Sequence, residues 1–153
     1  MALTLNHYSI RTLDLDGCRD FYQGVLGLTI GPRPTFPFPG FWMYRGPHTD
    51  YANAVVHIIG IDKDNPDGLV SYLGGRDSSA PQGTGVIDHV AFFADGLVAM
   101  LIHLREKGIE FRERTVPDIG LHQLFLNDPD GVTVELNYPA GEKIALDSAS
   151  GNS

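Results

Sequence analysis

The sequence predicts an α+β fold made of two copies of one βαβββ module. Three landmarks recur at a nearly constant offset, which favours an internal duplication over chance. His7 returns as His89 after 82 residues, His57 is matched by Glu135 after 78, and Gly27 is matched by Gly108 after 81. The hydrophobic pattern between these landmarks places the same order of elements in each half.

The first module covers residues 3–60. A strand at 3–12 precedes a helix that begins near the capping carboxylates Asp14 and Asp16 and ends at Gly27. Three further strands are predicted at 28–31, 41–45 and 54–60. Residues 61–86 are rich in Gly, Asp, Ser and Pro and show no period, so we interpret them as the linker between the modules.

The second module covers residues 87–140 and repeats this order. A strand at 87–93 leads into an amphipathic helix near 97–107. Strands are then predicted at 109–114, 121–126 and 132–138, and the Asp-Gly pair between the last two is a hairpin signal. Both modules belong to a single domain over residues 1–140, and we expect residues 141–153 to form a flexible tail.

Composition narrows the class of partner. A chain of 153 residues fits one domain, and its net charge of −8 argues against a nucleic-acid partner, because phosphate contacts depend on Lys and Arg. The single cysteine, Cys18, excludes an intramolecular disulfide and suits a reducing compartment. No apolar run approaches the ~20 residues of a membrane span, and the N-terminus lacks a signal-peptide pattern. We therefore expect a cytoplasmic protein with a small-molecule substrate and no membrane partner.

The duplicated positions predict a metal site. Side chains alternate between the two faces of a strand, so His57, His89 and Glu135 point away from the apolar positions beside them. A carboxylate among apolar residues is costly to bury unless it is paired. With His7 on the first strand, three imidazoles and one carboxylate occupy equivalent positions, a donor set typical of divalent metal sites.

Other roles for these residues stay open at this point. A single histidine in a strand is usually a hydrogen-bonded structural residue. The metal-site hypothesis therefore depends on the repeat-related placement of these residues and not on any one histidine. His57 can be a ligand, an acid–base group or a structural residue. Substrate contacts are predicted at Ser9, Arg11, Trp42, Gln123, Phe125 and Asn137. Arg11 can instead pair with an acidic neighbour, and the aromatic segment 36–42 can be a pocket lip, a dimer contact or the edge of the core.

Motifs spread over residues 3–138 carry a family resemblance. They are His7, Phe21-Tyr22 with Leu26-Gly27-Leu28, Asp88-His89, and Asp128-Pro129-Asp130-Gly131-Val132-Thr133-Val134-Glu135-Leu136. The chain resembles the vicinal oxygen chelate superfamily, which includes glyoxalase I, methylmalonyl-CoA epimerase, bleomycin- and fosfomycin-resistance proteins and extradiol dioxygenases. The resemblance implies that the sheets curl around one divalent ion (Fe, Mn, Zn, Ni or Co) held by His7, His89 and Glu135, with His57 as a further candidate ligand. It also implies a homodimer.

The resemblance leaves three functions to weigh. The first is a glyoxalase-like lyase or isomerase, in which a metal-chelated substrate loses and regains a proton through His57 or Glu135. His57 stands where glyoxalase I places a carboxylate or amide ligand, so lactoylglutathione lyase itself is a poor match. The second is a one-domain extradiol dioxygenase, whose histidine near this strand is an acid–base group but whose usual tyrosine is replaced by Phe125. The third is a metal-free binding protein, which predicts that the ligands would be missing.

Overall fold

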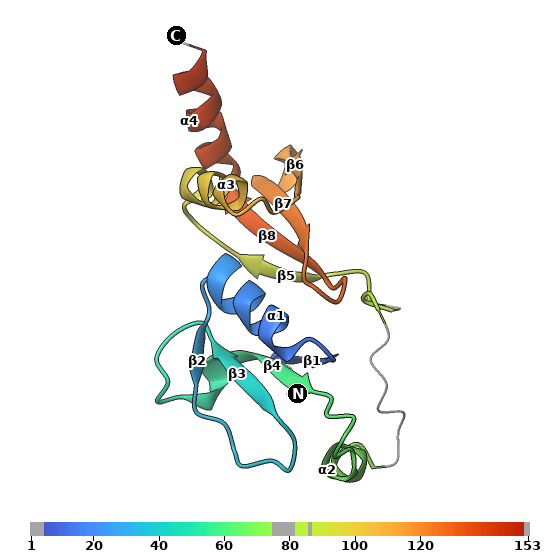
Figure 1. Cartoon of the computed structure of the whole chain (residues 1–153). Helices are drawn as coiled ribbons and strands as arrows, with labels where there is room; N and C mark the ends of the chain where they lie inside the picture. The colour runs from blue at the N-terminus through green and yellow to red at the C-terminus, as the bar shows by residue number, and fades with distance from the viewer. Residues whose placement is uncertain (1–4, 75–81, 86, 152–153) are drawn as a thin grey trace. The chain divides into compact units, whose positions relative to one another are not determined.

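The computed structural model describes residues 5–74, 82–85 and 87–151, and the chain divides into two compact units. Unit 1 comprises residues 1–81 and unit 2 comprises residues 82–153. Each unit contains one four-stranded sheet, as Figure 1 shows. The predicted α+β class and the two βαβββ modules are confirmed. Within the described residues, none of the helices combines the length and the apolar character that crossing a bilayer requires.

Unit 1 arranges its strands in the order β1-β4-β3-β2. Strand β1 runs parallel to β4, and the other neighbouring pairs are antiparallel. The elements of unit 1 are β1 (Tyr8–Thr12), α1 (Leu15–Arg19), η1 (Asp20–Val25), β2 (Thr29–Gly31), β3 (Gly40–Tyr44), η2 (Tyr51–Asn53), β4 (Ala54–Gly60) and α2 (Asp67–Tyr72).

Local chemistry determines where the first helix begins and ends. The Oδ1 atom of Asp14 accepts a hydrogen bond from the N–H of Gly17 at 2.9 Å, which caps α1. The helix continues through the π-helical segment η1 and stops at Gly27, whose φ of 77° suits a residue without a Cβ. The predicted start and stop of this helix are therefore confirmed.

One face of the unit 1 sheet is apolar and forms the core. Ile10, Met43, Val56 and Ile58 are buried on this face, and α1 lies against β4. Each such side chain stabilises the fold by roughly 1.5–3 kcal/mol when it leaves water. The opposite face of the same strands is thereby left to the candidate functional residues.

Unit 2 repeats the topology with the order β5-β8-β7-β6, and β5 runs parallel to β8. Its core face includes the buried residues Leu124, Val134 and Leu136. The elements of unit 2 are β5 (Val90–Phe93), α3 (Leu97–Glu106), β6 (Arg112–Val116), η3 (Pro117–Ile119), β7 (Leu121–Asn127), β8 (Thr133–Pro139) and α4 (Ala140–Ser150).

The predicted hairpin turn between β7 and β8 is confirmed. The Oδ1 atom of Asp128 accepts from the N–H groups of Asp130 and Val132 at 2.9 and 2.8 Å. Gly131 adopts a φ of 83°, which most other residues would adopt only with strain. This turn fixes the register that pairs Asn127 with Thr133 and Phe125 with Glu135.

Three expectations about element bounds differ from the structure. Strands β1 and β5 begin later than predicted, so His7 and His89 each stand one residue before their strand. The expected linker contains α2, and the expected flexible tail forms α4 over Ala140–Ser150. Helix α4 packs against α3, β7 and β8, and the carboxylate of Glu142 accepts from the N–H of Leu97 at 2.6 Å, so tertiary contacts define this helix.

Candidate functional site

Strand register places three predicted residues of unit 1 in one row. Ser9 of β1 and Trp42 of β3 both pair with His57 of β4. Arg11, two residues beyond Ser9, pairs with Ile59 and lies on the same face. All of them point away from the apolar core face, as strand alternation predicts.

The His57 ring is stacked between two other rings. The His7 ring lies 3.7 Å from it on one side at an interplanar angle of 16°, and the Trp42 ring lies 3.9 Å away at 9°. Its Nε2 atom is buried and has no hydrogen-bond partner among the described residues. Burial, together with the neighbouring His7 ring, lowers the pKa of His57 to about 4, so this imidazole is neutral around pH 7.

The stack argues against His7 and His57 as ligands of the same ion. The lone pair of an imidazole nitrogen lies in the ring plane, and a bound ion sits about 2.1 Å from that nitrogen. The two rings are nearly parallel and their centroids are 3.7 Å apart. A shared ion in the plane of one ring would lie well out of the plane of the other ring, away from the lone pair of that nitrogen. His57 therefore suits proton transfer better than ligation alongside His7.

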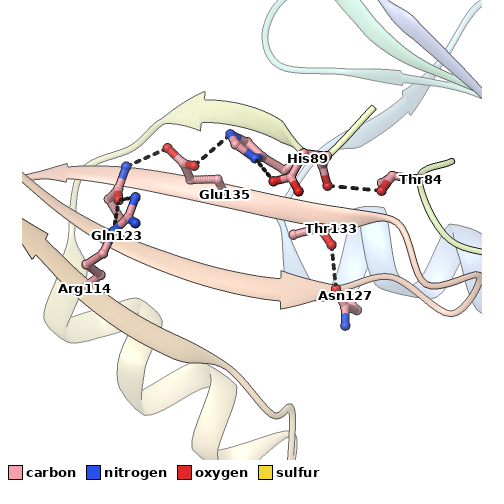
Figure 2. Close-up of polar contacts among 8 residues, drawn as sticks. Thr84, His89, Arg114, Gln123, Asn127, Thr133 and Glu135 are labelled. Atoms are coloured by element: carbon pink, nitrogen blue, oxygen red, sulfur yellow. Dashed lines mark hydrogen bonds and ion pairs between the residues drawn. The ribbon is translucent and has the colours of Figure 1, made fainter. Parts of the chain in front are cut away.

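Unit 2 joins its predicted residues through a chain of polar contacts. The Nε2 atom of His89 lies 3.0 Å from Oε2 of Glu135, whose residue is only 6% exposed. The Gln123 amide donates to Glu135 Oε1 at 2.8 Å and to Asn137 Oδ1 at 2.9 Å. Arg114 donates to Gln123 Oε1 from two nitrogens at 2.9 and 2.7 Å. Figure 2 shows this path from His89 through Glu135 and Gln123 to Arg114.

The donor pair in unit 2 fits a divalent ion. Two ligand atoms that each lie about 2.1 Å from one ion are separated by at most about 4.2 Å. The separation between His89 Nε2 and Glu135 Oε2 is 3.0 Å. A nitrogen and a carboxylate oxygen together suit Zn, Mn, Fe, Ni or Co, so the donor set passes this test without selecting among these metals.

Each repeat-related histidine is oriented by the residue before it. The Nδ1 atom of His7 lies 2.6 Å from Oδ1 of Asn6, and the Nδ1 atom of His89 lies 2.7 Å from Oδ2 of Asp88. A proton on Nδ1 leaves the Nε2 lone pair for a metal. Asn6 was not predicted as functional, although its position relative to Asp88 in the repeat would have identified it.

Phe125 lies beside the donor pair of unit 2. Its ring meets that of His89 edge to face, with 6.3 Å between centroids. Arg112 and Arg114 approach the same ring at 5.1 and 5.4 Å from its centroid. Neither arginine was predicted as a site residue. The alternation of Arg-Glu-Arg at 112–114 is the sequence signal that would have found them.

His122 lies on the opposite face of β7, as expected once Gln123 faces Glu135. Its Nδ1 atom lies 2.8 Å from Thr115 Oγ1 and its Nε2 atom lies 2.8 Å from Glu113 Oε2. The residue is 2% exposed. Both nitrogens of His122 meet side chains of β6, on the face away from Glu135, so this buried histidine joins β7 to β6.

The aromatic segment of unit 1 has two roles. Phe38 is buried in a cluster with Ile59, Leu69 and Leu73, which makes it an edge of the core. Trp42 instead stacks on His57 and meets the Tyr51 ring at 5.6 Å. The indole therefore forms an aromatic wall on the His57 face. Taken by unit, unit 1 contains His7 and His57, and unit 2 contains His89 and Glu135.

Comparison with known sequences gives a family match. The model of the Glyoxalase/Bleomycin resistance protein/Dioxygenase superfamily matches residues 4–136. The chain is 28% identical over 139 residues to Glyoxylase I 4 of Arabidopsis thaliana, covering 87% of this chain and 69% of that protein. It is 25% identical over 146 residues to lactoylglutathione lyase of Schizosaccharomyces pombe, covering 86% of this chain and 46% of that enzyme. The chain thus spans less than half of the yeast lyase.

Solved structures show the same fold. A glyoxalase family protein from Bacillus anthracis has a TM-score of 0.63 at 18% identity, covering 91% of this chain and 97% of that chain. The trypanothione-dependent glyoxalase I of Leishmania major has a TM-score of 0.62 at 19% identity, covering 99% and 95%. At these identities the likeness concerns the fold alone.

Proposed function

Because the chain belongs to the Glyoxalase/Bleomycin resistance protein/Dioxygenase superfamily, we propose that it is a divalent-metal-dependent lyase or isomerase of the glyoxalase type. Its substrate is a small oxygenated molecule that chelates the metal through two adjacent oxygens. Members of this superfamily usually bind a divalent metal. The observation that carries the proposal is the 3.0 Å pairing of His89 Nε2 with the buried carboxylate of Glu135.

The proposed ligands are His7, His89 and Glu135. Both histidines have Nδ1 engaged by the preceding side chain, which leaves Nε2 for the metal. A bound divalent ion with open positions supplies Lewis acidity, which stabilises negative charge that develops on a substrate oxygen. Gln123 contacts Glu135 and Asn137 and therefore holds the ligand carboxylate in place.

His57 is the proposed acid–base group. Two stacked rings hold its imidazole, and its Nε2 atom has no protein partner among the described residues. A neutral imidazole accepts a proton from substrate carbon and returns it at a neighbouring atom. Glu135, the other candidate, has its two oxygens engaged by His89 and Gln123, which favours His57 for this step.

The remaining predicted contacts are assigned to the substrate by their positions. Ser9 and Trp42 flank His57, and Arg11 follows on the same face. Phe125 lies against His89 and offers an apolar surface. Superfamily members often form dimers, and we extend the proposal to a homodimer, which sedimentation of the purified chain would test.

One observation keeps the extradiol dioxygenase as a second candidate. A neutral histidine held beside His7 is the acid–base group that ring cleavage of a catechol would use. Against it, Phe125 brings no hydroxyl group to the position expected of a tyrosine. The two functions therefore differ in what they predict for a catechol substrate.

The test begins with metal analysis of protein purified without chelator. The metal-loaded protein is then incubated with hydroxyacetone in D₂O, and deuterium uptake at the carbon beside the carbonyl is followed by NMR. The proposal expects bound metal and metal-dependent exchange that is lost in His57→Phe. Anaerobic Fe(II) loading followed by catechol and oxygen gives a yellow product only if the dioxygenase reading is right. A protein that takes up no metal is a binding protein instead.

A further inference from the structure

Strand β6 carries two arginines on the face that holds Glu135. Arg112 pairs with Phe125 in the register of β6 and β7, and Arg114 pairs with Gln123. Phe125 in turn pairs with Glu135 across β7 and β8. Glu113, between the two arginines, points to the other face and meets His122 at 2.8 Å. The carboxylate that is nearest in sequence therefore does not neutralise either arginine.

Both guanidinium groups lack an acidic partner in the part of the chain that the structure describes. Arg112 lies over Phe125, and Arg114 lies over the same ring while it donates to the neutral amide of Gln123. Two cations beside one ring repel each other, although the chain as a whole has a net charge of −8. An arriving anion relieves this repulsion, and the guanidinium fork matches a carboxylate in geometry.

A cavity lies beside Arg112. Its volume is about 850 Å³, and its lining includes Arg112, Phe125 and Thr133 together with the segment 108–111. This volume falls within the ~300–1,000 Å³ typical of small-molecule sites. Glu110 also lines the cavity and Arg114 does not, so the lining has no net charge; the positive charge that would attract an anion is that of Arg112 together with Arg114 on the same strand.

The spacing of the sheet relates this cavity to the donor pair. Glu135 lies on β8 and Arg112 on β6, with β7 between them. Neighbouring strands are about 4.8 Å apart, so the two residues are separated by roughly 10 Å across the sheet. Arginine side chains shorten that gap. A small linear molecule can therefore contact the donor pair with one end and the arginines with the other.

Resting on the function proposed above, we propose that Arg112 and Arg114 form an anion subsite, so that the substrate is a small carboxylic acid. One end of this acid presents the two adjacent oxygens that chelate the metal. The other end presents a carboxylate to the two guanidinium groups, with Phe125 between them as an apolar contact.

Two hydroxamates test the subsite without knowledge of the natural substrate. The monohydroxamate of glutaric acid chelates a metal at one end and carries a carboxylate at the other. Its amide analogue chelates equally and is neutral. Calorimetric titration of the Mn(II)-loaded protein should show at least about tenfold tighter binding of the acid, the scale of one charge-assisted hydrogen bond. Arg112→Gln should remove most of this preference and leave the affinity for the amide unchanged.

Matched variants separate a local contact from a general charge effect. Arg112→Lys keeps the charge and should retain part of the preference. Arg105→Gln removes an exposed arginine from α3 and should leave the preference intact. Equal affinity of the wild-type protein for both hydroxamates would overturn the subsite, as would an equal loss in Arg105→Gln. Failure to bind either hydroxamate would instead remove the chelating site on which the subsite rests.

Discussion

The two units use the same backbone position for different chemistry. On β4, His57 lies between Ser9 and Trp42, and on β8, Glu135 lies between Ala91 and Phe125. Both sites therefore combine one small and one aromatic neighbour. The imidazole stacks on its aromatic neighbour, whereas the carboxylate turns to His89 and Gln123.

The strand topology is the same in both units and places a side chain at the same point of each sheet. The chemistry of that side chain determines which contacts it makes. A flat neutral ring gains contact area and rigidity between two other rings. A buried carboxylate requires donors, and it is satisfied by an imidazole and an amide. We infer a division of roles in which His57 is a proton carrier and Glu135 an anionic ligand. The predictions below test this division, from the largest expected effect to the smallest.

The largest effect is expected from His57→Phe. Phenylalanine keeps a flat ring between His7 and Trp42 but cannot carry a proton. Deuterium exchange should fall by about 10²–10⁴-fold, the usual contribution of a positioned acid–base group. Metal affinity should stay within about threefold of the wild type. A parallel loss of metal would show that His57 is a ligand, and the division of roles would fail.

The next effect concerns the carboxylate of unit 2. Glu135→Gln keeps the size of the side chain and removes its charge, so metal affinity in chelator competition should fall by at least about 100-fold. Trp42→Phe is the matched change in unit 1 and should leave affinity unaltered. An affinity that survives Glu135→Gln would place the metal elsewhere.

Substituting the residues that orient His7 and His89 should lower metal affinity by a smaller factor. Asp88→Ala removes a charged partner of His89, and Asn6→Ala removes a neutral partner of His7. We expect metal affinity to fall by about 10–100-fold for Asp88→Ala, and by less for Asn6→Ala. Asp88→Asn should recover part of the loss. Identical affinity in all variants would mean that neither residue orients a ligand.

The smallest effect is expected on the free energy of unfolding, when the caps of the helices α1 and α3 are removed. Asp14 caps α1 from the adjacent residue, whereas Glu142 caps α3 from a distant helix. Asp14→Ala and Glu142→Ala should each lower the free energy of unfolding by about 1 kcal/mol in urea titrations. Only Glu142→Ala should also loosen α4, which amide hydrogen exchange would detect as faster exchange over residues 140–150. Equal exchange in both variants would contradict a role for this cap in holding α4.

Features with a local cause could be predicted from the sequence. The helix stop at Gly27 and the turn at Asp128–Gly131 depend on backbone angles and on side chains a few residues away. Helix α4 could not be predicted in the same way. Its residue Glu142 caps α3 through the N–H of Leu97, and these two residues are 45 positions apart in the sequence. Likewise, strand alternation placed His57 and Glu135 on their faces but contained no information on ring orientation.

The candidate site also has features that the sequence predicts and features that depend on contacts between distant residues. The duplicated histidines were visible because repeats preserve spacing. The stack of His7, His57 and Trp42 depends on side-chain rotamers and on the β3–β4 register. Arg112 and Arg114 gain significance only once β6 is known to pair with β7. Contacts between distant strands are the part that a single sequence does not specify.

Metal stoichiometry tests the central claim most directly. The wild-type chain, His7→Ala and His89→Ala are each purified without chelator, and metal per chain is measured by mass spectrometry alongside the folded state. We predict about one ion per wild-type chain and almost none in either variant, with both variants still folded. A full complement of metal in either folded variant would contradict it.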